Sequence, residues 1–112
     1  MRIYLSRPDI TAKEIEAVCA VLRSPNLSLG PKLEEFESAF VRYIGRKRAV
    51  AVNSGTSGLF LCMPALGIRP GDEVITTPFT FIASATSIMM AGARPVFVDI
   101  DPANLKLPMT AV

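Results

Sequence analysis

A short apolar run followed by six small residues constrains the fold of this chain more than any other feature. The run, Ala49 to Val52, has no polar alternation, so it predicts a strand buried on both faces. The small residues, Asn53 to Gly58, let a backbone turn sharply and approach a ligand closely. Apolar residues at helical spacing follow from Thr56 to Leu66. A strand, a turn and a helix in this order bring free N–H groups and a positive helix dipole to one point, which suits a phosphate.

The local pattern alone leaves the phosphate site open, because most turns of small residues between a strand and a helix bind nothing. Two common phosphate motifs are disfavoured. A P-loop would need Gly-Lys-Ser/Thr after the turn, and that sequence does not follow. The dinucleotide motif would need one residue between its first two glycines, whereas Gly55 and Gly58 have two residues between them.

The N-terminal third of the chain predicts two helices. Thr11 and Glu14 fit a capping box for a helix over 12–23, because each side chain can satisfy a free N–H group. Pro31 suits the first position of a second amphipathic helix, which Gly45 should end.

The rest of the chain predicts short strands alternating with helices. Pro64 should kink the third helix or end it early, because its ring crowds the preceding turn. Residues 69–72, Arg-Pro-Gly-Asp, predict a type II turn. Strands are expected over 73–77 and 95–99, with a helix over 82–91 between them.

Strands separated by helices imply right-handed crossovers and a parallel sheet. The predicted fold class is therefore α/β, a partial parallel sheet with flanking helices. We divide the chain into a helical lead-in, residues 1–47, and a β-α-β-α-β core, residues 48–112. Ligands of such sheets bind beyond the carboxyl ends of the strands. Residues 53–57, 77–81 and 99–101 all follow predicted strands, so we expect them to line one edge.

Composition suggests apolar surfaces that something else covers. Hydrophobic residues make up 50% of the 112 residues and charged residues 20%, which is apolar for a soluble chain of this size. The longest weakly polar run, 81–93, is too short to cross a bilayer, and the start has no signal-peptide core. We therefore expect a cytoplasmic protein, no membrane partner and an incomplete chain whose apolar surface is covered by further chain or by a partner.

Charge and residue usage exclude several classes of function. A net charge of +2 provides no field on the scale that nucleic-acid binding needs, and the cluster Arg46 to Arg48 is expected to be a solvated corner. Cys19 and Cys62 are expected to be small core side chains, not a disulfide or metal pair. The sequence has no histidine, which excludes histidine acid–base chemistry and histidine metal sites within this chain.

Several segments together resemble the DegT/DnrJ-type aminotransferases, in order and with consistent spacing over nearly the whole chain. These enzymes use pyridoxal phosphate (PLP), have fold type I and mostly act on nucleotide-linked keto-sugars. The resemblance implies that this chain is the N-terminal portion of their PLP-binding large domain. The segments that carry it are 28–31, 33–37, 54–57, 65–74, 77–81 and 91–102.

The resemblance also implies roles for single residues. The turn that contains Gly55, Thr56 and Ser57 would hold the cofactor's phosphate, through the Thr56 hydroxyl and through the Ser57 backbone N–H and hydroxyl. Phe81 would stack on the pyridine ring, although the residues alone favour a core position for it. Asp99 and the neighbouring Asp101 are expected to cap a strand-end turn, not to catalyse.

No catalytic residue is expected within this chain. Members of the family need a Schiff-base lysine and an aspartate that pairs with the pyridine nitrogen, and the resemblance implies that both lie beyond Val112. We therefore expect this chain to bind PLP weakly or not at all. Because family members are dimers and the composition is apolar, we also expect a homodimer or another form of self-association. Four lysines match no part of the family's lysine motif: Lys13, Lys32, Lys47 and Lys106.

The function implied for the whole protein is PLP-dependent transamination of a nucleotide-linked keto-sugar, with an amino acid as amino donor, in amino-sugar or cell-surface polysaccharide biosynthesis. Three alternatives stay open at this point. They are a PLP-dependent sugar dehydratase of the same family, a catalytically inactive truncated or regulatory fragment, and a generic phosphate-binding α/β module without PLP.

Overall fold

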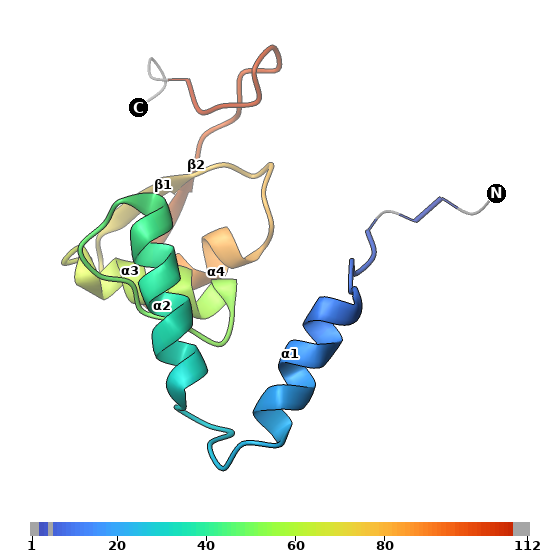
Figure 1. Ribbon diagram of the computed structural model, residues 1–112. Coiled ribbons are helices and arrows are strands. Elements are labelled where there is room, and N and C mark those ends of the chain that lie inside the picture. Colours follow the sequence, from blue (N-terminus) through green and yellow to red (C-terminus); the bar gives the residue numbers. More distant parts are fainter. Residues whose placement is uncertain (1–2, 5, 109–112) are drawn as a thin grey trace. The chain divides into compact units, whose positions relative to one another are not determined.

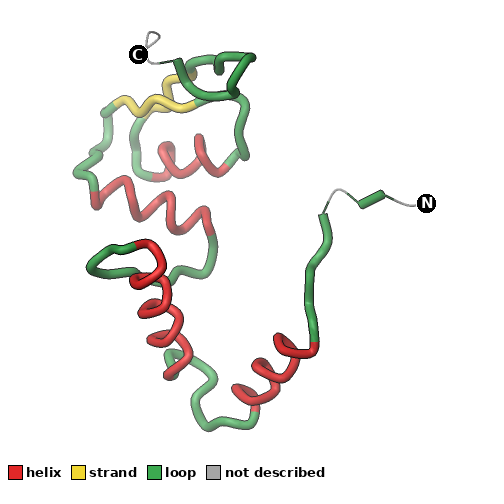
Figure 2. Tube along the Cα trace, turned by 45° about the horizontal axis from the view of Figure 1, so that its top comes forward, coloured by secondary structure: helices red, strands yellow, loops and turns green. Residues whose placement is uncertain are grey.

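The computed structural model describes residues 3, 4 and 6–108, which form helices and a small sheet (Figure 1). The chain divides into two compact units, an N-terminal unit over residues 1–51 and a C-terminal unit over residues 52–112. Within the described residues there are four α-helices and two strands, and both strands lie in the C-terminal unit (Figure 2). None of these helices is long and apolar enough to cross a membrane.

The end of the chain at Val112 lies outside the described residues. The expectation that the Schiff-base lysine and the pyridine-pairing aspartate lie beyond Val112 concerns chain that this sequence does not include. That expectation therefore stays a prediction.

The N-terminal unit consists of α1, Ala12–Leu22, and α2, Pro31–Ile44, joined by an irregular loop. The predicted capping box is confirmed at Thr11, and the predicted Pro occupies the first turn of α2. Gly45 ends α2 with φ +64°, in the left-handed region that glycine adopts without a steric penalty. Both predicted helices are therefore confirmed, and each ends within one residue of its expected end.

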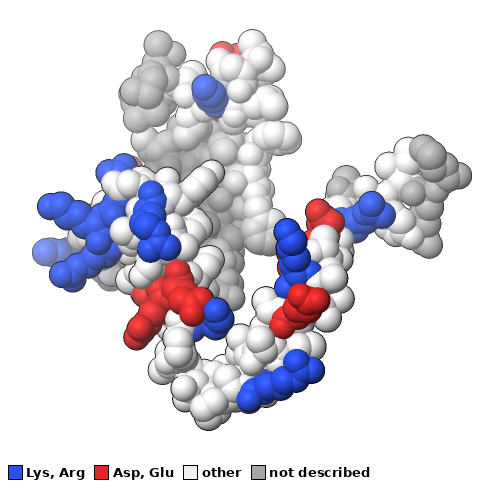
Figure 3. Space-filling model, in the orientation of Figure 1, with Lys and Arg blue, Asp and Glu red and all other residues white. Residues whose placement is uncertain are grey.

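Charges on α2 follow the helix dipole. Glu34 lies in the first turn and Arg42 in the last turn, as the positive N-terminal and negative C-terminal ends of a helix favour. Figure 3 shows Lys and Arg side chains gathered beside the C-terminal end of this helix. Arg46, Lys47 and Arg48 are all exposed, in agreement with the expected solvated corner.

The predicted strand over Ala49 to Val52 is wrong, because the segment is irregular and Val50 is 80% exposed. A strand needs a neighbour that accepts and donates backbone hydrogen bonds. Within the described part of the chain, the two strands that do form pair only with each other. The segment finds one substitute partner, since the Ala51 N–H donates to a Glu37 carboxylate oxygen at 2.8 Å.

The C-terminal unit contains α3, Gly55–Ala65, β1, Glu73–Thr76, α4, Ala83–Met90, and β2, Arg94–Phe97. β1 and β2 pair in parallel, with register from Glu73 opposite Arg94 to Thr76 opposite Phe97, and α4 makes the crossover between them. This arrangement confirms the predicted α/β class with a partial parallel sheet.

Layering in the C-terminal unit places α4 in the middle. α4 packs against both strands, and α3 packs against α4. The buried side chains come from α4 and the turn after it, and all but one of them are small, which lets the backbones approach closely. They are Ala83, Ala85, Ser87, Ile88 and Ala93.

Turns in the C-terminal unit follow the predicted chemistry. α3 ends one residue after Pro64, and Gly67 follows with φ +82°. Gly71 has φ +94° and the Asp72 N–H donates to the Arg69 carbonyl at 3.1 Å, which confirms the type II turn.

Candidate functional site

The start of α3 is held by its own side chains. Ser54 is the N-cap, and its hydroxyl oxygen accepts the Ser57 backbone N–H at 3.1 Å. Ser is preferred at this position because its oxygen satisfies one of the N–H groups that a helix leaves without an intrahelical partner. The predicted turn of small residues is thus a helix cap, and its geometry fixes where the remaining N–H groups lie.

Ser57 is fully engaged within the turn. Its hydroxyl donates to the Asn53 side-chain oxygen at 2.7 Å and lies 2.9 Å from the Ser54 hydroxyl oxygen. Its backbone N–H is already bound to Ser54. In this structure Ser57 therefore offers no free donor for a phosphate, in contrast to the role that the resemblance implied.

Gly55 and Thr56 provide the free donors at the helix start. They are the first two residues of α3, so their N–H groups have no intrahelical acceptor. Within residues 3, 4 and 6–108, no hydrogen bond engages either N–H or the Thr56 hydroxyl. These donors lie at the positive end of the helix dipole, where an anion is favoured.

Phe81 lies at the same pocket as this helix start. A cavity of about 500 Å³ is lined by Gly55, Thr56 and Phe81, and this volume lies within the range of small-molecule sites, roughly 300–1,000 Å³. Phe81 is 75% exposed, so the core position that the residues alone favoured is wrong. An exposed aromatic ring beside free N–H donors is the arrangement that a flat, phosphate-bearing ligand needs.

Four further lining residues were not among the predicted site residues: Gly58, Leu59, Cys62 and Ala83. The first three could have been found from helical spacing, because positions 55, 58, 59 and 62 share one face of a helix. Cys62 is an exposed free thiol, so its expected core position is wrong, whereas Cys19 is partly buried. Ala83 comes from α4 and needed the packing of α4 on α3 to be placed.

The third predicted contributor to the sheet edge does not line this cavity. Asp99 accepts the Ile100 N–H at 2.9 Å, and Asp101 accepts the Ala103 N–H at 2.8 Å. Both carboxylates thus cap a turn after β2, as expected. Of the three loops expected to line one edge, those containing Thr56 and Phe81 meet at the cavity.

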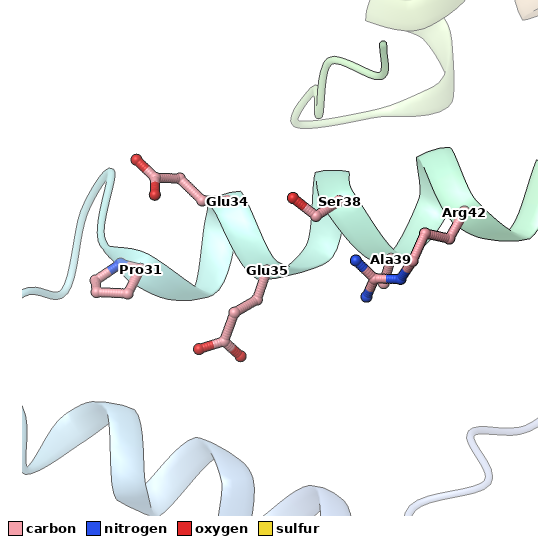
Figure 4. Close-up of a pocket in the computed structure, with 6 residues that line it drawn as sticks. All are labelled: Pro31, Glu34, Glu35, Ser38, Ala39 and Arg42. Carbon is pink, nitrogen blue, oxygen red and sulfur yellow. The ribbon is translucent and has the colours of Figure 1, made fainter. Parts of the chain in front are cut away.

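A second hollow lies on α2 in the N-terminal unit, with a volume of about 550 Å³. Figure 4 shows Glu35 and Arg42 extending to one side of the helix and Glu34 to the other. Glu35 also pairs with Lys32 at 2.5 Å. This hollow contains none of the residues predicted to hold the phosphate or the ring, so the cavity beside α3 remains the candidate site.

Comparison with known proteins identifies the class. The model of the DegT/DnrJ/EryC1/StrS aminotransferase family matches residues 8–112. The chain therefore belongs to the DegT/DnrJ/EryC1/StrS aminotransferase family, which confirms the resemblance read from the sequence.

Two curated relatives show what kinds of protein this chain is similar to. The spore coat polysaccharide biosynthesis protein SpsC of Bacillus subtilis (strain 168) is 51% identical over 102 residues, which are 91% of this chain. The UDP-4-amino-4-deoxy-L-arabinose–oxoglutarate aminotransferase of Shewanella sediminis is 46% identical over 101 residues, or 90% of this chain. In both comparisons the matched part is 26% of the relative, so the chain spans about a quarter of their length.

Solved structures share the fold closely. The PLP form of Spr1654 from Streptococcus pneumoniae, assigned as a sugar aminotransferase, superposes with a TM-score of 0.92 at 37% identity, covering 100% of this chain and 30% of that chain. DesV of S. venezuelae, in complex with a ketimine intermediate, gives a TM-score of 0.83 at 41% identity, covering 89% of this chain and 27% of that chain. The fold of this chain is thus the fold of one part of such enzymes.

Proposed function

We propose that the C-terminal unit carries the phosphate-binding and ring-binding part of a PLP site in a sugar aminotransferase. The observation that carries this proposal is the shared cavity, in which the free N–H groups of Gly55 and Thr56 lie beside the exposed ring of Phe81. A solved relative in its PLP form supports the choice of cofactor. The donors fit a phosphate dianion, and the aromatic face fits a flat heterocycle.

Each of these residues has a role in binding. The Gly55 and Thr56 N–H groups and the Thr56 hydroxyl hold the phosphate by charge-assisted hydrogen bonds. Phe81 fixes the plane of the ring without adding a charge that would alter its electronics. When bound, PLP supplies the electron-withdrawing ring through which an amino group is exchanged between an amino acid and a keto-sugar.

For the whole protein we propose transamination of a nucleotide-linked keto-sugar, with the covalently binding lysine and the pyridine-pairing aspartate provided by residues beyond Val112. We favour transamination over dehydration because one curated relative is an aminotransferase and the solved neighbours include sugar aminotransferases. Polysaccharide biosynthesis, as in the name of SpsC, supports the biosynthetic setting. A cytoplasmic location belongs to the same proposal.

A cofactor titration tests the binding roles. We expect weak, reversible PLP binding by the 112-residue chain, because the covalent link is missing. Thr56→Ala should raise the dissociation constant about tenfold through loss of a hydrogen bond to a charged group. Phe81→Ala should raise it roughly three- to tenfold through loss of ring stacking.

Phe79 provides a matched control, because it lies in the same loop and is 67% exposed but does not line the cavity. Phe79→Ala should bind PLP as the unsubstituted chain does. Equal affinities for the unsubstituted chain and the Thr56→Ala variant would contradict the proposed phosphate site.

A further inference from the structure

We infer that Asn53 is a positioning residue, which acts through Ser57 to leave Gly55 and Thr56 as the anion donors of the site. The inference rests on the proposed function and assigns the turn residues differently from the resemblance. Three contacts carry it. The Ser57 hydroxyl lies 2.7 Å from Asn53 Oδ1 and 2.9 Å from the Ser54 hydroxyl oxygen, and the Ser57 N–H lies 3.1 Å from that same oxygen.

Counting protons gives these contacts a direction. A hydroxyl has one proton to donate, and Asn Oδ1 can only accept, so the Ser57 proton points to Asn53. Ser54 must then be the donor in its contact with the Ser57 oxygen. The Ser54 hydroxyl therefore donates to Ser57, and the Ser57 hydroxyl donates to Asn53. Both serine protons and the Ser57 N–H are used inside the turn.

The direction of these hydrogen bonds determines which groups can hold a phosphate. Ser57, with its hydroxyl proton committed to Asn53, could present only lone pairs to an anion, and lone pairs would repel it. The Gly55 and Thr56 N–H groups and the Thr56 hydroxyl remain available and line the cavity. Asn53 thus holds the helix start in its binding conformation before the ligand arrives, which lowers the ordering cost of binding.

The test is a double-mutant cycle on PLP binding, with pyridoxal as the probe that lacks the phosphate. Asn53→Ala and Ser57→Ala should each weaken PLP binding about three- to fivefold, in line with the net contribution of roughly 1 kcal/mol from one hydrogen bond. The double variant should be no weaker than either single variant, because the two residues act through one bond. Pyridoxal affinity should not change in any of them.

Two controls separate positioning from general loss of structure. Ser57→Thr keeps the hydroxyl and should restore PLP affinity to that of the unsubstituted chain. Thr11→Ala removes side-chain hydrogen bonds at the start of α1, in the other unit, and should leave the ratio of PLP to pyridoxal affinity unchanged. Far-UV circular dichroism checks that each variant keeps its helix content.

The possible outcomes distinguish the inference from the proposed function. If Ser57→Ala weakens PLP binding as much as Thr56→Ala does, and its effect adds to that of Asn53→Ala, then Ser57 is a direct ligand and the inference is wrong. Wild-type affinity in both Asn53→Ala and Ser57→Ala, with Thr56→Ala still impaired, overturns the role of Asn53 but keeps the phosphate site. Equal affinity of the unsubstituted chain for PLP and pyridoxal overturns the phosphate site itself and, with it, the role of Asn53.

Discussion

At the start of α1, Thr11 and Glu14 hold each other in place. The Thr11 N–H and hydroxyl both donate to one Glu14 carboxylate oxygen, at 2.6 Å and 2.5 Å, while the Thr11 oxygen accepts the Lys13 N–H at 3.3 Å. Donation from the Thr11 hydroxyl, and next from its N–H, lowers the pKa of Glu14 below its ordinary value. Because the charged form accepts these bonds best, the capping box is strongest when Glu14 is ionised.

We predict that acid weakens α1. A carboxyl whose pKa is lower in the folded state stabilises the fold above its unfolded-state pKa, and this contribution is lost as pH falls through the lowered folded-state pKa. Helix content should therefore fall with acidification in that range, as measured by circular dichroism. Glu14→Gln keeps an acceptor but cannot ionise, so its helix content should vary less with pH. An identical acid transition in both proteins would contradict the prediction.

Some features of the proposed site could be expected before the structure was known, and others depend on its geometry. The proposed roles of Thr56 and Phe81 came from the family resemblance, because the residues alone left the phosphate site open and favoured a core position for Phe81. The engagement of Ser57 by Asn53 could not be expected, because it depends on side-chain orientation. Similarly, the exposure of Phe81 depends on what packs around it.

The turns around α4 determine how this element is held. Gly92 follows α4 with φ +78°, and its carbonyl accepts the Gly71 N–H at 3.1 Å, which ties the two turns together. A Cβ atom added at Gly92 would lie 3.0 Å from Pro70 Cγ and 3.3 Å from Pro70 Cα. The positive φ favours glycine at this position, and the Pro70 ring would have to shift by a few tenths of an ångström to admit a Cβ atom.

We predict that Gly92→Ala lowers the free energy of unfolding by about 2 kcal/mol or more, because left-handed strain of roughly 1–2 kcal/mol is joined by the clash with Pro70. Gly67 is the matched control: its φ is +82°, and an added Cβ atom would meet nothing within 4 Å. Gly67→Ala should therefore cost only the strain, about 1 kcal/mol. Urea denaturation measures both values, and equal losses would show that the Pro70 contact is unimportant.

Across the whole molecule, large apolar side chains are unusually exposed. On α1, Ile15, Val18 and Leu22 are 56–64% exposed. On α2, Phe36 and Phe40 contact each other, with ring centroids 5.7 Å apart, yet they are 56% and 46% exposed. Exposed apolar surface of this extent is typical of surfaces that another protein segment covers.

We predict that the 112-residue chain self-associates in solution. Light scattering should give a mass that rises above the monomer value with increasing concentration. Because the association would be apolar, added salt should not dissociate it, unlike contact between charged surfaces. A constant monomer mass across the concentration series would contradict the prediction.

The sequence by itself determined the local elements and their order. The capping box, the Pro and Gly positions at helix ends and the type II turn all depend on residues within a few positions of one another, and the parallel crossover follows from the order of strands and helices along the chain. These predictions were confirmed to within one or two residues. The motifs that showed the family are of the same kind, because they are fixed spacings along the chain.

Only the tertiary structure decided the features that depend on contacts between separate segments, namely strand pairing, side-chain burial and the lining of the cavity. Ala49 to Val52 has the composition of a buried strand, yet it is irregular, because strand pairing needs a neighbouring strand and composition cannot supply one. In the same way, the tertiary structure leaves Cys62 exposed and brings Thr56 and Phe81 to one cavity. Hydrogen bonds and burial between residues distant in sequence are properties of the fold, so single residue types indicate them only after the elements have been placed.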